Sequence, residues 1–490
     1  MKFFKKIVGF ALVVALALSA LGCSEKGDGV PENLSEYVID AVFDDESKTL
    51  SVKQSVDYIN EFDVELNELY FHLYPNAYRE DARFKPFTDA DMADAYPDGV
   101  SYGGINITAL KVGGKTQEIV IGGQDDDILI VSFGDCLMPT SRIKIEMEYT
   151  VTVPNVRHRL GYYNKTVNLG NFYPIACVYE NGEFESSPYY SNGDPFYSAV
   201  ANYKVSITAP KKYTAAMSGL CVVTETQDEK KTFASQQAAR DFAIVLGEFQ
   251  QVSTTADGVA VTYYYYDDES FDASLNAAAD SVKTFNELFG KYPYKSLSVV
   301  QTHFLNGGME YPALVYASDR QRGELYRDVI IHEVAHQWWY ALVGNNQISH
   351  AWLDETLAEY SATLFYEKNP GYNVGYSARI ADAMKTYSLF CDRFENTVDK
   401  SMDRKLPEFS MPIEYTVMTY VKGQIMMDSL RKTIGDDAFF KGFKKYFEEN
   451  IYKIAQPENL IGAFEKASGK DLMSFFNTWL DGNVMTFAKS

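Results

Sequence analysis

The hydrophobic pattern of the chain changes once, near Val252, and this change limits the folds that the chain can adopt. Over residues 34–251, short runs rich in β-branched and aromatic residues alternate with clusters of Gly, Asn, Asp and Pro, a pattern typical of strands. Beyond about Ser270, apolar residues recur with helical spacing over long stretches. We therefore expect an α+β protein with an N-terminal mostly-β domain over residues 34–252 and a mostly helical domain over residues 253–490.

Individual elements can be predicted within each half. The clearest strand-like runs lie at residues 48–58, 118–121, 128–133, 143–153 and 203–209. Helical stripes lie at residues 273–289, 324–342, 352–368, 374–390, 417–434, 436–449 and 457–467, with two further strands expected at 296–302 and 313–316. The chain has 490 residues, of which 46% are hydrophobic. Because single cores stop growing at about 250 to 300 residues, we expect at least two domains.

The first residues have the parts of an export signal. Three lysines precede an apolar run at residues 7–21, which ends in Gly22 and Cys23. This arrangement resembles a lipoprotein signal, in which residues 1–22 are removed, Cys23 is lipidated and residues 23–33 form a flexible tether. We expect an exported protein anchored by lipid at Cys23 to the outer face of a bacterial membrane. Ordinary cleavage after Gly22, which would release a secreted protein, and an uncleaved anchor are the alternatives.

Charge and cysteine content exclude other classes of protein. A formal net charge of −22 argues against nucleic acid as a partner, because phosphate backbones are bound by clustered Lys and Arg. The four remaining cysteines are too few and too widely spaced for a disulfide scaffold or a C-x-x-C metal site. We expect these four to be buried as small hydrophobic residues: Cys136, Cys177, Cys221 and Cys391.

One segment has a metal-binding pattern. His332 and His336 are four residues apart, so on a helix their imidazoles lie on one face and can reach one ion. Glu333 follows the first histidine directly and can approach a water on that metal without binding the metal itself. The chain has only six histidines, which makes a chance occurrence of this spacing improbable.

A catalytic zinc site needs a third protein ligand. Glu355 lies 19 residues after His336, a distance that allows the first helix to end near Gly344 and the chain to return antiparallel. Glu359 lies on the same face of the second helix, one turn later. Spacing alone leaves both glutamates open as the third ligand.

The order of these residues resembles a known family. His-Glu-x-x-His followed after eighteen residues by Glu, within Trp352-Leu-Asp-Glu355, is similar to the gluzincin aminopeptidases related to aminopeptidase N and leukotriene hydrolase. The resemblance implies a saddle-like β domain followed by a thermolysin-like catalytic domain with one Zn²⁺ per chain. It also selects Glu355 as the third ligand beside His332 and His336.

Gly307-Gly308-Met309-Glu310-Tyr311 is similar to the Gly-x-Met-Glu-Asn strand of that family. There the Glu pairs with the free α-ammonium of the substrate and the glycine backbone lies along the peptide. The resemblance thus implies that Gly307, Gly308, Met309 and Glu310 bind substrate. Tyr311 stands where the family usually has Asn, so we expect the first substrate pocket to differ.

Two further segments continue the resemblance. Tyr420-Val-Lys-Gly is similar to the Tyr-x-Lys-Gly segment that supplies the family's oxyanion-stabilising tyrosine, which implies this role for Tyr420. Tyr415 is a weaker candidate for the same role. Trp339-Tyr340 stands in place of the usual aromatic-Gly-Asn after the second histidine.

Together these features predict a zinc metallopeptidase that releases N-terminal residues from peptides with a free N-terminus. A zinc-activated water would attack the peptide bond, with Glu333 as general base and then acid and Tyr420 stabilising the oxyanion. Asp354 or Glu359 would orient a ligand imidazole. The alternatives are a zinc endopeptidase, a non-catalytic peptide-binding lipoprotein and an epoxide hydrolase.

Overall fold

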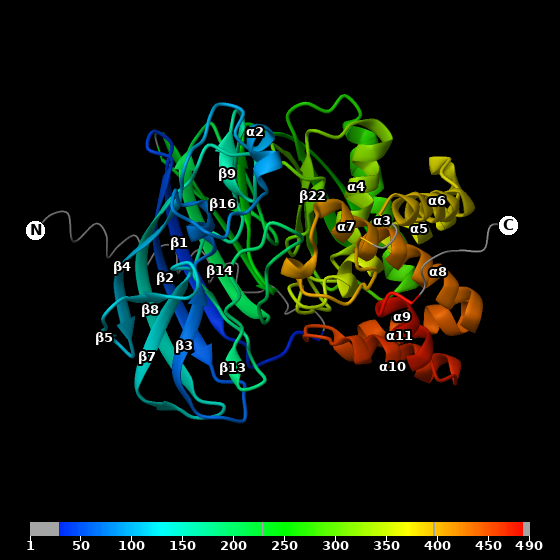
Figure 1. The fold of residues 1–490 in the computed structure, drawn as a ribbon. Helices are drawn as coiled ribbons and strands as arrows, with labels where there is room; N and C mark the ends of the chain where they lie inside the picture. Colours follow the sequence, from blue (N-terminus) through cyan, green and yellow to red (C-terminus); the bar gives the residue numbers. More distant parts are fainter. Residues whose placement is uncertain (1–28, 228, 395–396, 484–490) are drawn as a thin grey trace, which may run out of the picture.

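The computed structural model describes residues 29–227, 229–394 and 397–483. The predicted signal peptide, the expected lipidation site Cys23 and the first part of the predicted tether lie outside these residues. Strands of the N-terminal half lie on the left of Figure 1, helices of the C-terminal half lie on the right, and the short strand β22 (Gly308–Met309) lies between them. The expected α+β architecture, with a mostly-β half followed by a mostly helical half, is confirmed.

An eight-stranded sheet forms the body of the N-terminal half. Its strands, in sheet order, are β16 (Val222–Thr226), β17 (Lys230–Ala239), β14 (Ala201–Pro210), β1 (Glu36–Asp44), β2 (Thr49–Ile59), β8 (Arg142–Thr152), β4 (Gly104–Val112) and β5 (Lys115–Thr116). Buried and exposed residues alternate along β1 and β2, because successive side chains of a strand point to opposite faces. One face of this sheet therefore supplies the core of the domain.

Shorter sheets cover that core. One has the order β15 (Thr214–Met217), β18 (Ile244–Gly247), β10 (Thr166–Leu169) and β9 (Leu160–Tyr163), and a second has the order β11 (Ile175–Ala176), β3 (Leu66–His72), β7 (Ile128–Leu137) and β6 (Val120–Gly122). β12 (Tyr179–Glu180) and β13 (Glu183–Phe184) form a hairpin. The short helices of this half are η1 (Tyr74–Tyr78), η2 (Asp89–Asp91) and α2 (Met92–Ala95).

The C-terminal half begins with a five-stranded sheet. Its order is β19 (Gln250–Ala256), β20 (Val259–Tyr265), β21 (Ser296–Thr302), β23 (Leu314–Ser318) and β22. β20, β21 and β23 run parallel, whereas β22 pairs antiparallel at the edge. The predicted boundary at residues 252/253 falls inside β19, and the exact division of the chain stays a prediction.

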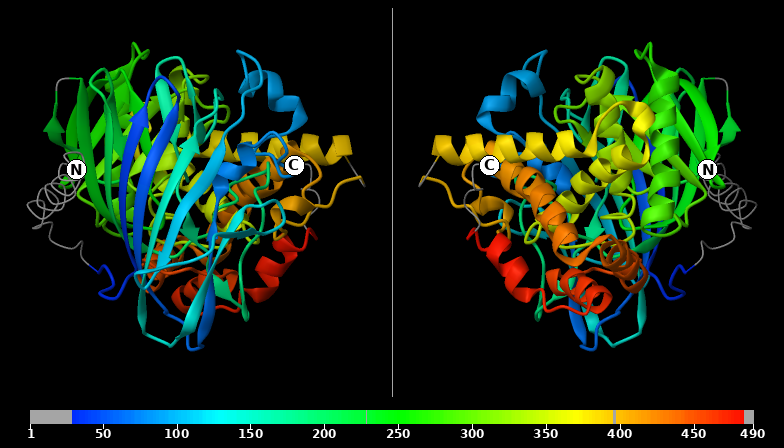
Figure 2. Two further views of the ribbon diagram at one scale, coloured as in Figure 1. Left: turned by 90° about the vertical axis from the view of Figure 1, so that its left-hand side faces the viewer. Right: turned by 90° about the vertical axis from the view of Figure 1, so that its right-hand side faces the viewer.

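Helices make up the rest of this half. They are α3 (Phe271–Leu288), α4 (Gly323–Ala335), α5 (Trp352–Lys368), η3 (Pro370–Tyr372), α6 (Tyr376–Phe394), η4 (Leu406–Glu408), α7 (Pro412–Thr416), the π-helical η5 (Val417–Lys422), α8 (Gly423–Ile434), α9 (Asp436–Asn450), α10 (Pro457–Ser468) and α11 (Met473–Leu480). In the left view of Figure 2 the strands face the viewer, and in the right view the helices do. Among the described helices, none combines the length and the apolar character that crossing a bilayer requires.

Two sequence expectations need correction. The helix expected over residues 324–342 ends at Ala335, because the chain turns after His336 and Tyr340 has a φ of 144°, outside the helical region. The apolar residues that suggested a longer helix, such as Trp338 and Trp339, are buried as a folded loop. Cys136 is exposed and Cys221 is half-buried rather than both being buried, and Cys177 and Cys391 are buried as expected.

Arg240 joins the two halves of the molecule. This residue is 1% exposed, and its guanidinium donates hydrogen bonds to the backbone carbonyls of Tyr340 at 3.0 Å, Ser198 at 2.9 Å and Lys453 at 3.0 Å. A side chain placed on Gly344 would collide with the guanidinium, since an added Cβ lies 2.0 Å from Arg240 Cζ. The loop after α4 is therefore held by a cation from the N-terminal half.

Candidate metal centre

Three predicted ligands converge at one point. His332 lies in the last turn of α4 and His336 caps its end, and their Nε2 atoms are 3.1 Å apart. Glu355, in the first turn of α5, places Oε2 3.3 Å from His332 Nε2 and 3.2 Å from His336 Nε2. Ligand atoms about 2.0 to 2.1 Å from a tetrahedral zinc are about 3.3 Å from one another. Two imidazoles and a carboxylate at these separations fit such an ion.

The opposite ring nitrogens of both histidines are occupied. His336 Nδ1 lies 2.9 Å from the carbonyl oxygen of Trp339, which can only accept, so Nδ1 carries the proton and Nε2 is left as a metal donor. His332 Nδ1 lies 3.2 Å from Glu359 Oε2. Of the two glutamates left open by spacing, Glu355 thus faces the Nε2 atoms and Glu359 orients an imidazole from behind.

Asp354 does not contact either imidazole through a hydrogen bond. Its two oxygens accept from Asn345 Nδ2 at 3.1 Å and Gln347 Nε2 at 2.7 Å. Asp354, Glu310 and His336 form a second group whose possible ligand atoms lie within 4.8 Å of one another, but this group has only one imidazole and shares it with the first. The donor set of the first group is therefore the better zinc site.

The charges around this point favour a cation. Burial opposes ionisation of Glu355, but His336 and His332 outweigh it and hold the pKa of this carboxyl well below its usual range. Burial also opposes the charged form of His336, yet Glu310 and Glu355 raise its pKa to about 10. The buried carboxylates of the site thus demand positive charge at the point where the Nε2 atoms meet.

Glu333 lies beside the three ligands and directly against β22. A Cβ added to Gly308 would lie 2.5 Å from Glu333 Cγ and Oε1, so a larger residue would displace this carboxylate from its observed position. Glu333 is 7% exposed, and burial raises its pKa to about 7 against the lowering effect of the two histidines.

Tyr420 contacts two of the ligands. Its hydroxyl donates to Glu355 Oε1 at 2.5 Å, and its ring stacks on that of His332 with centroids 5.7 Å apart. The π-helical turn η5 carries Tyr420, and such turns are frequent at functional sites. Tyr415 instead packs edge-on against Tyr420 at 5.9 Å, which makes it a support for Tyr420.

Glu310 follows β22 at the edge of the site and is 3% exposed. Gln347 Nε2 donates to its Oε1 at 3.1 Å. Its backbone carbonyl accepts from Gln337 Nε2 at 3.3 Å, so the segment that carries the histidines also fixes this strand. Gly307 is tied to β23 through its carbonyl, which accepts from Ser318 N at 2.9 Å.

Tyr311 and Tyr340 bind residues of the N-terminal half. The ring of Tyr311 is fully buried, and its hydroxyl donates to Asn171 Oδ1 at 2.7 Å. The hydroxyl of Tyr340 donates to Asp241 Oδ2 at 2.7 Å. Both departures from the family pattern therefore lie where the two halves of the molecule meet, and the expected effect of Tyr311 on a substrate pocket stays a prediction.

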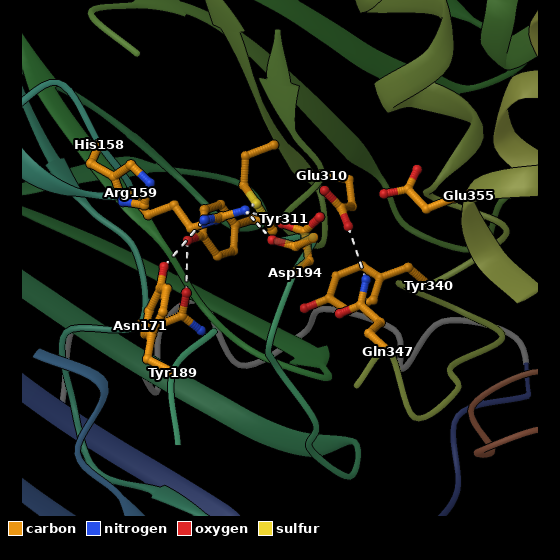
Figure 3. A network of polar contacts seen from close by, with 12 residues as sticks. His158, Arg159, Asn171, Tyr189, Asp194, Glu310, Tyr311, Tyr340, Gln347 and Glu355 are labelled. Atoms are coloured by element: carbon orange, nitrogen blue, oxygen red, sulfur yellow. Dashed lines mark hydrogen bonds and ion pairs between the residues drawn. The ribbon is translucent and has the colours of Figure 1, made fainter. Parts of the chain in front are cut away.

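Sequence analysis did not single out Arg159 and Asp194 as site residues. The guanidinium of Arg159 pairs with Asp194, accompanied by bonds to Tyr189 Oη and the Gly193 carbonyl, both at 3.1 Å (Figure 3). Arg159 Nε also lies 3.2 Å from Met309 Sδ, beneath the strand that holds Glu310. Neither residue belongs to a sequence motif. Their contacts beneath the strand that leads to Glu310 are visible only when the fold brings distant segments together.

Known proteins are similar to this chain in sequence. Residues 273–479 match the peptidase family M1 domain. Aminopeptidase N of Lactococcus lactis subsp. lactis is 31% identical over 234 residues, which are 44% of this chain and 27% of that protein. Aminopeptidase M1-A of Oryza sativa subsp. japonica is 24% identical over 412 residues, which are 78% of this chain and 45% of that protein. The chain thus spans less than half the length of these relatives.

Solved structures support the fold over nearly the whole chain. The M1 zinc metallopeptidase from Deinococcus radiodurans superposes with a TM-score of 0.67 at 16% identity, covering 93% of this chain and 95% of that one. A mutant of the same protein bound to a Tyr-Ser-Ala substrate gives a TM-score of 0.68 at 17% identity, with the same coverage. Both domains of the chain therefore have counterparts in one solved fold.

Proposed function

We propose that the chain is a zinc-dependent aminopeptidase of the gluzincin, aminopeptidase N-like family and that it acts on peptides with a free N-terminus. The observation that carries this proposal is the placement of Glu310. Its buried carboxylate follows Gly308, the residue that touches Glu333, so an ammonium paired with Glu310 lies close to the reacting bond. Only the first residue of a peptide has an ammonium at that distance from a peptide carbonyl.

His332, His336 and Glu355 would hold the zinc ion. When bound, zinc acts as a Lewis acid that makes a water molecule more acidic and polarises the peptide carbonyl. Glu359 keeps the His332 ring in orientation through Nδ1, and the Trp339 carbonyl does the same for His336. The donor atoms are therefore fixed before the ion arrives.

Glu333 takes the proton of the attacking water and later returns it to the leaving amine. Its position beside His332 and His336 and its burial, which raises the pKa of this carboxyl, support this role. During the attack, Tyr420 turns its hydroxyl from Glu355 toward the oxyanion that develops on the substrate carbonyl. Charge develops on that oxygen as the water attacks and is absent from the bound substrate, so Tyr420 contributes to turnover more than to substrate binding.

Two assays test the proposal. A panel of aminoacyl fluorogenic substrates, measured with and without a chelator, should show hydrolysis that is lost on metal removal and restored by zinc. A matched panel of N-acetylated substrates should be cleaved poorly, because acetylation removes the ammonium that Glu310 would bind. Equal cleavage of both panels would indicate an endopeptidase. A wild-type protein that binds peptides but, like Glu333→Ala, shows no zinc-dependent hydrolysis would indicate a non-catalytic peptide-binding protein.

We also propose that the protein is exported and held to the outer face of a bacterial membrane through a lipid on Cys23. The support is the order of lysines, apolar run and Gly22-Cys23 at the start of the sequence. Labelling with a fatty-acid analogue should mark the wild-type protein and not Cys23→Ser. Equal labelling, or equal recovery of both proteins in the soluble fraction, would contradict this proposal.

A further inference from the structure

Gln347 has a place in the site that its sequence position does not reveal. It lies in the loop between α4 and α5 and is 1% exposed. Its Nε2 donates to Glu310 Oε1 at 3.1 Å and to Asp354 Oδ2 at 2.7 Å, so one carboxamide bridges two buried carboxylates. The other oxygen of Asp354 is held by Asn345 Nδ2 at 3.1 Å. Gln347 is therefore anchored at a fixed position beside Glu310.

The contacts of Gln347 determine the orientation of its amide group. The amide nitrogen lies within hydrogen-bond distance of one oxygen of Glu310 and one oxygen of Asp354, and the amide oxygen faces away from both. This oxygen, Oε1, is buried and has no hydrogen-bond partner within the described part of the chain. Buried polar atoms are nearly always paired, so this oxygen beside Glu310 requires a donor from a bound ligand or from water.

The position of Gln347 Oε1 defines the donor that fits it. The oxygen shares a carbon with the nitrogen that donates to Glu310 (Figure 3). A group bound by the Glu310 carboxylate therefore comes within reach of this oxygen. A primary ammonium has three N–H donors and no acceptor. It can bind Glu310 with one donor and the amide oxygen with another.

We propose that Gln347 is a specificity-determining residue that binds the α-ammonium of the substrate together with Glu310. This inference rests on the proposed aminopeptidase function. It assigns two tasks to one side chain, since Nε2 holds Glu310 in place and Oε1 accepts an N–H of the substrate. Hydrogen bonds that involve a charged group are stronger than neutral ones, so the contact is expected to change kcat/KM by roughly tenfold or more.

A double-mutant comparison separates the direct contact from an effect through Glu310. Gln347→Met removes the amide and keeps the length of the side chain. If Oε1 binds the ammonium, Gln347→Met lowers kcat/KM for a free aminoacyl substrate also in a Glu310→Ala background, by roughly tenfold and mainly through KM. If Gln347 only positions Glu310, or binds only water, the substitution has no effect in that background, and this result would overturn the inference.

Controls keep the result interpretable. Gln54→Met makes the same change at a buried glutamine in the eight-stranded sheet, where the amide bonds to Pro174 O and Tyr149 Oη, and it should leave KM unchanged. Thermal unfolding and zinc content of each variant verify folding and metal binding. Should Gln347→Met not fold, Gln347→Asn keeps an amide but shortens the chain by one methylene, and the same loss of kcat/KM in the Glu310→Ala background is expected.

The same data distinguish failure of this inference from failure of the proposed function. If the wild-type enzyme cleaves acetylated and free substrates equally, the aminopeptidase proposal fails. If the wild-type enzyme prefers free substrates and Glu310→Ala weakens that preference, but Gln347→Met has no effect in the Glu310→Ala background, only the role of Gln347 is wrong.

Discussion

The metal side of the site, formed by His332, His336 and Glu355, differs from the substrate side, formed by Glu310 and Gln347, in how its residues are held. The metal side uses adjacent turns of two neighbouring helices, and its imidazoles are oriented by Glu359 and a nearby carbonyl. The substrate side depends on an edge strand of two residues and on a loop amide. A metal centre can thus be specified by local helix geometry, whereas recognition of the substrate needs segments that only the whole fold brings together.

The largest effect is expected for a substitution of Glu333, which tests whether catalysis on the metal side can be lost while zinc binding is kept. Glu333→Gln keeps the shape of the side chain but removes the group that takes the proton, so kcat should fall by about 10² to 10⁴-fold. Zinc content should stay at one ion per chain, because Glu333 is not among the converging ligands. Stopped-flow or steady-state hydrolysis together with metal analysis makes the comparison. Loss of zinc along with activity would show that Glu333 belongs to the metal side as a ligand.

Glu359→Gln tests whether the metal side depends on its supporting residue. The substitution weakens the contact with His332 Nδ1, at 3.2 Å, and also the pairing with Arg379 at 2.9 Å. Metal affinity should fall by about 10 to 100-fold, measured by competition with a chromogenic chelator. Glu324→Gln, an exposed change on the first turn of α4, is the matched control and should bind metal like the wild type. An unchanged affinity in Glu359→Gln would show that α4 alone orients the ring.

Gly308→Ala tests the point where the two sides touch. The added methyl group would lie 2.5 Å from Glu333 Oε1, and the flexible carboxylate should move aside, so activity should fall by roughly tenfold while folding is kept. Gly462→Ala is the matched control, because a Cβ added to this glycine of α10 has no atom within 4 Å. Hydrolysis rates and thermal unfolding of both variants are the measurements. Equal hydrolysis rates of Gly308→Ala and its control would mean that Glu333 can move away from the added methyl group without loss of catalysis.

The same contrast explains how much could be predicted from the sequence. The ligand spacing and the helix at residues 352–368 follow from helical periodicity, and α5 has these bounds in the structure. The end of α4 could not be predicted, because Trp338 and Trp339 are apolar in a buried loop as they would be in a helix. Gln347, Arg159 and Asp194 were missed since their partners are distant in sequence and none belongs to a motif. Periodicity reports which face of an element is buried, and it contains no information on contacts between distant segments.

Tyr311→Phe has the smallest expected effect on catalysis and tests whether Tyr311 serves the substrate side or the contact between the two halves. The substitution removes the hydroxyl that donates to Asn171 Oδ1 at 2.7 Å and leaves that buried oxygen without this donor. The free energy of unfolding should fall by about 1 to 3 kcal/mol, as measured by urea denaturation. Because the hydroxyl points to the N-terminal half, kcat/KM should change less than about twofold across substrates with different first residues. A change in kcat/KM that depends on the first residue of the substrate would instead place Tyr311 in the substrate pocket, as the family resemblance implied. Tyr311 would then belong to the substrate side of the site.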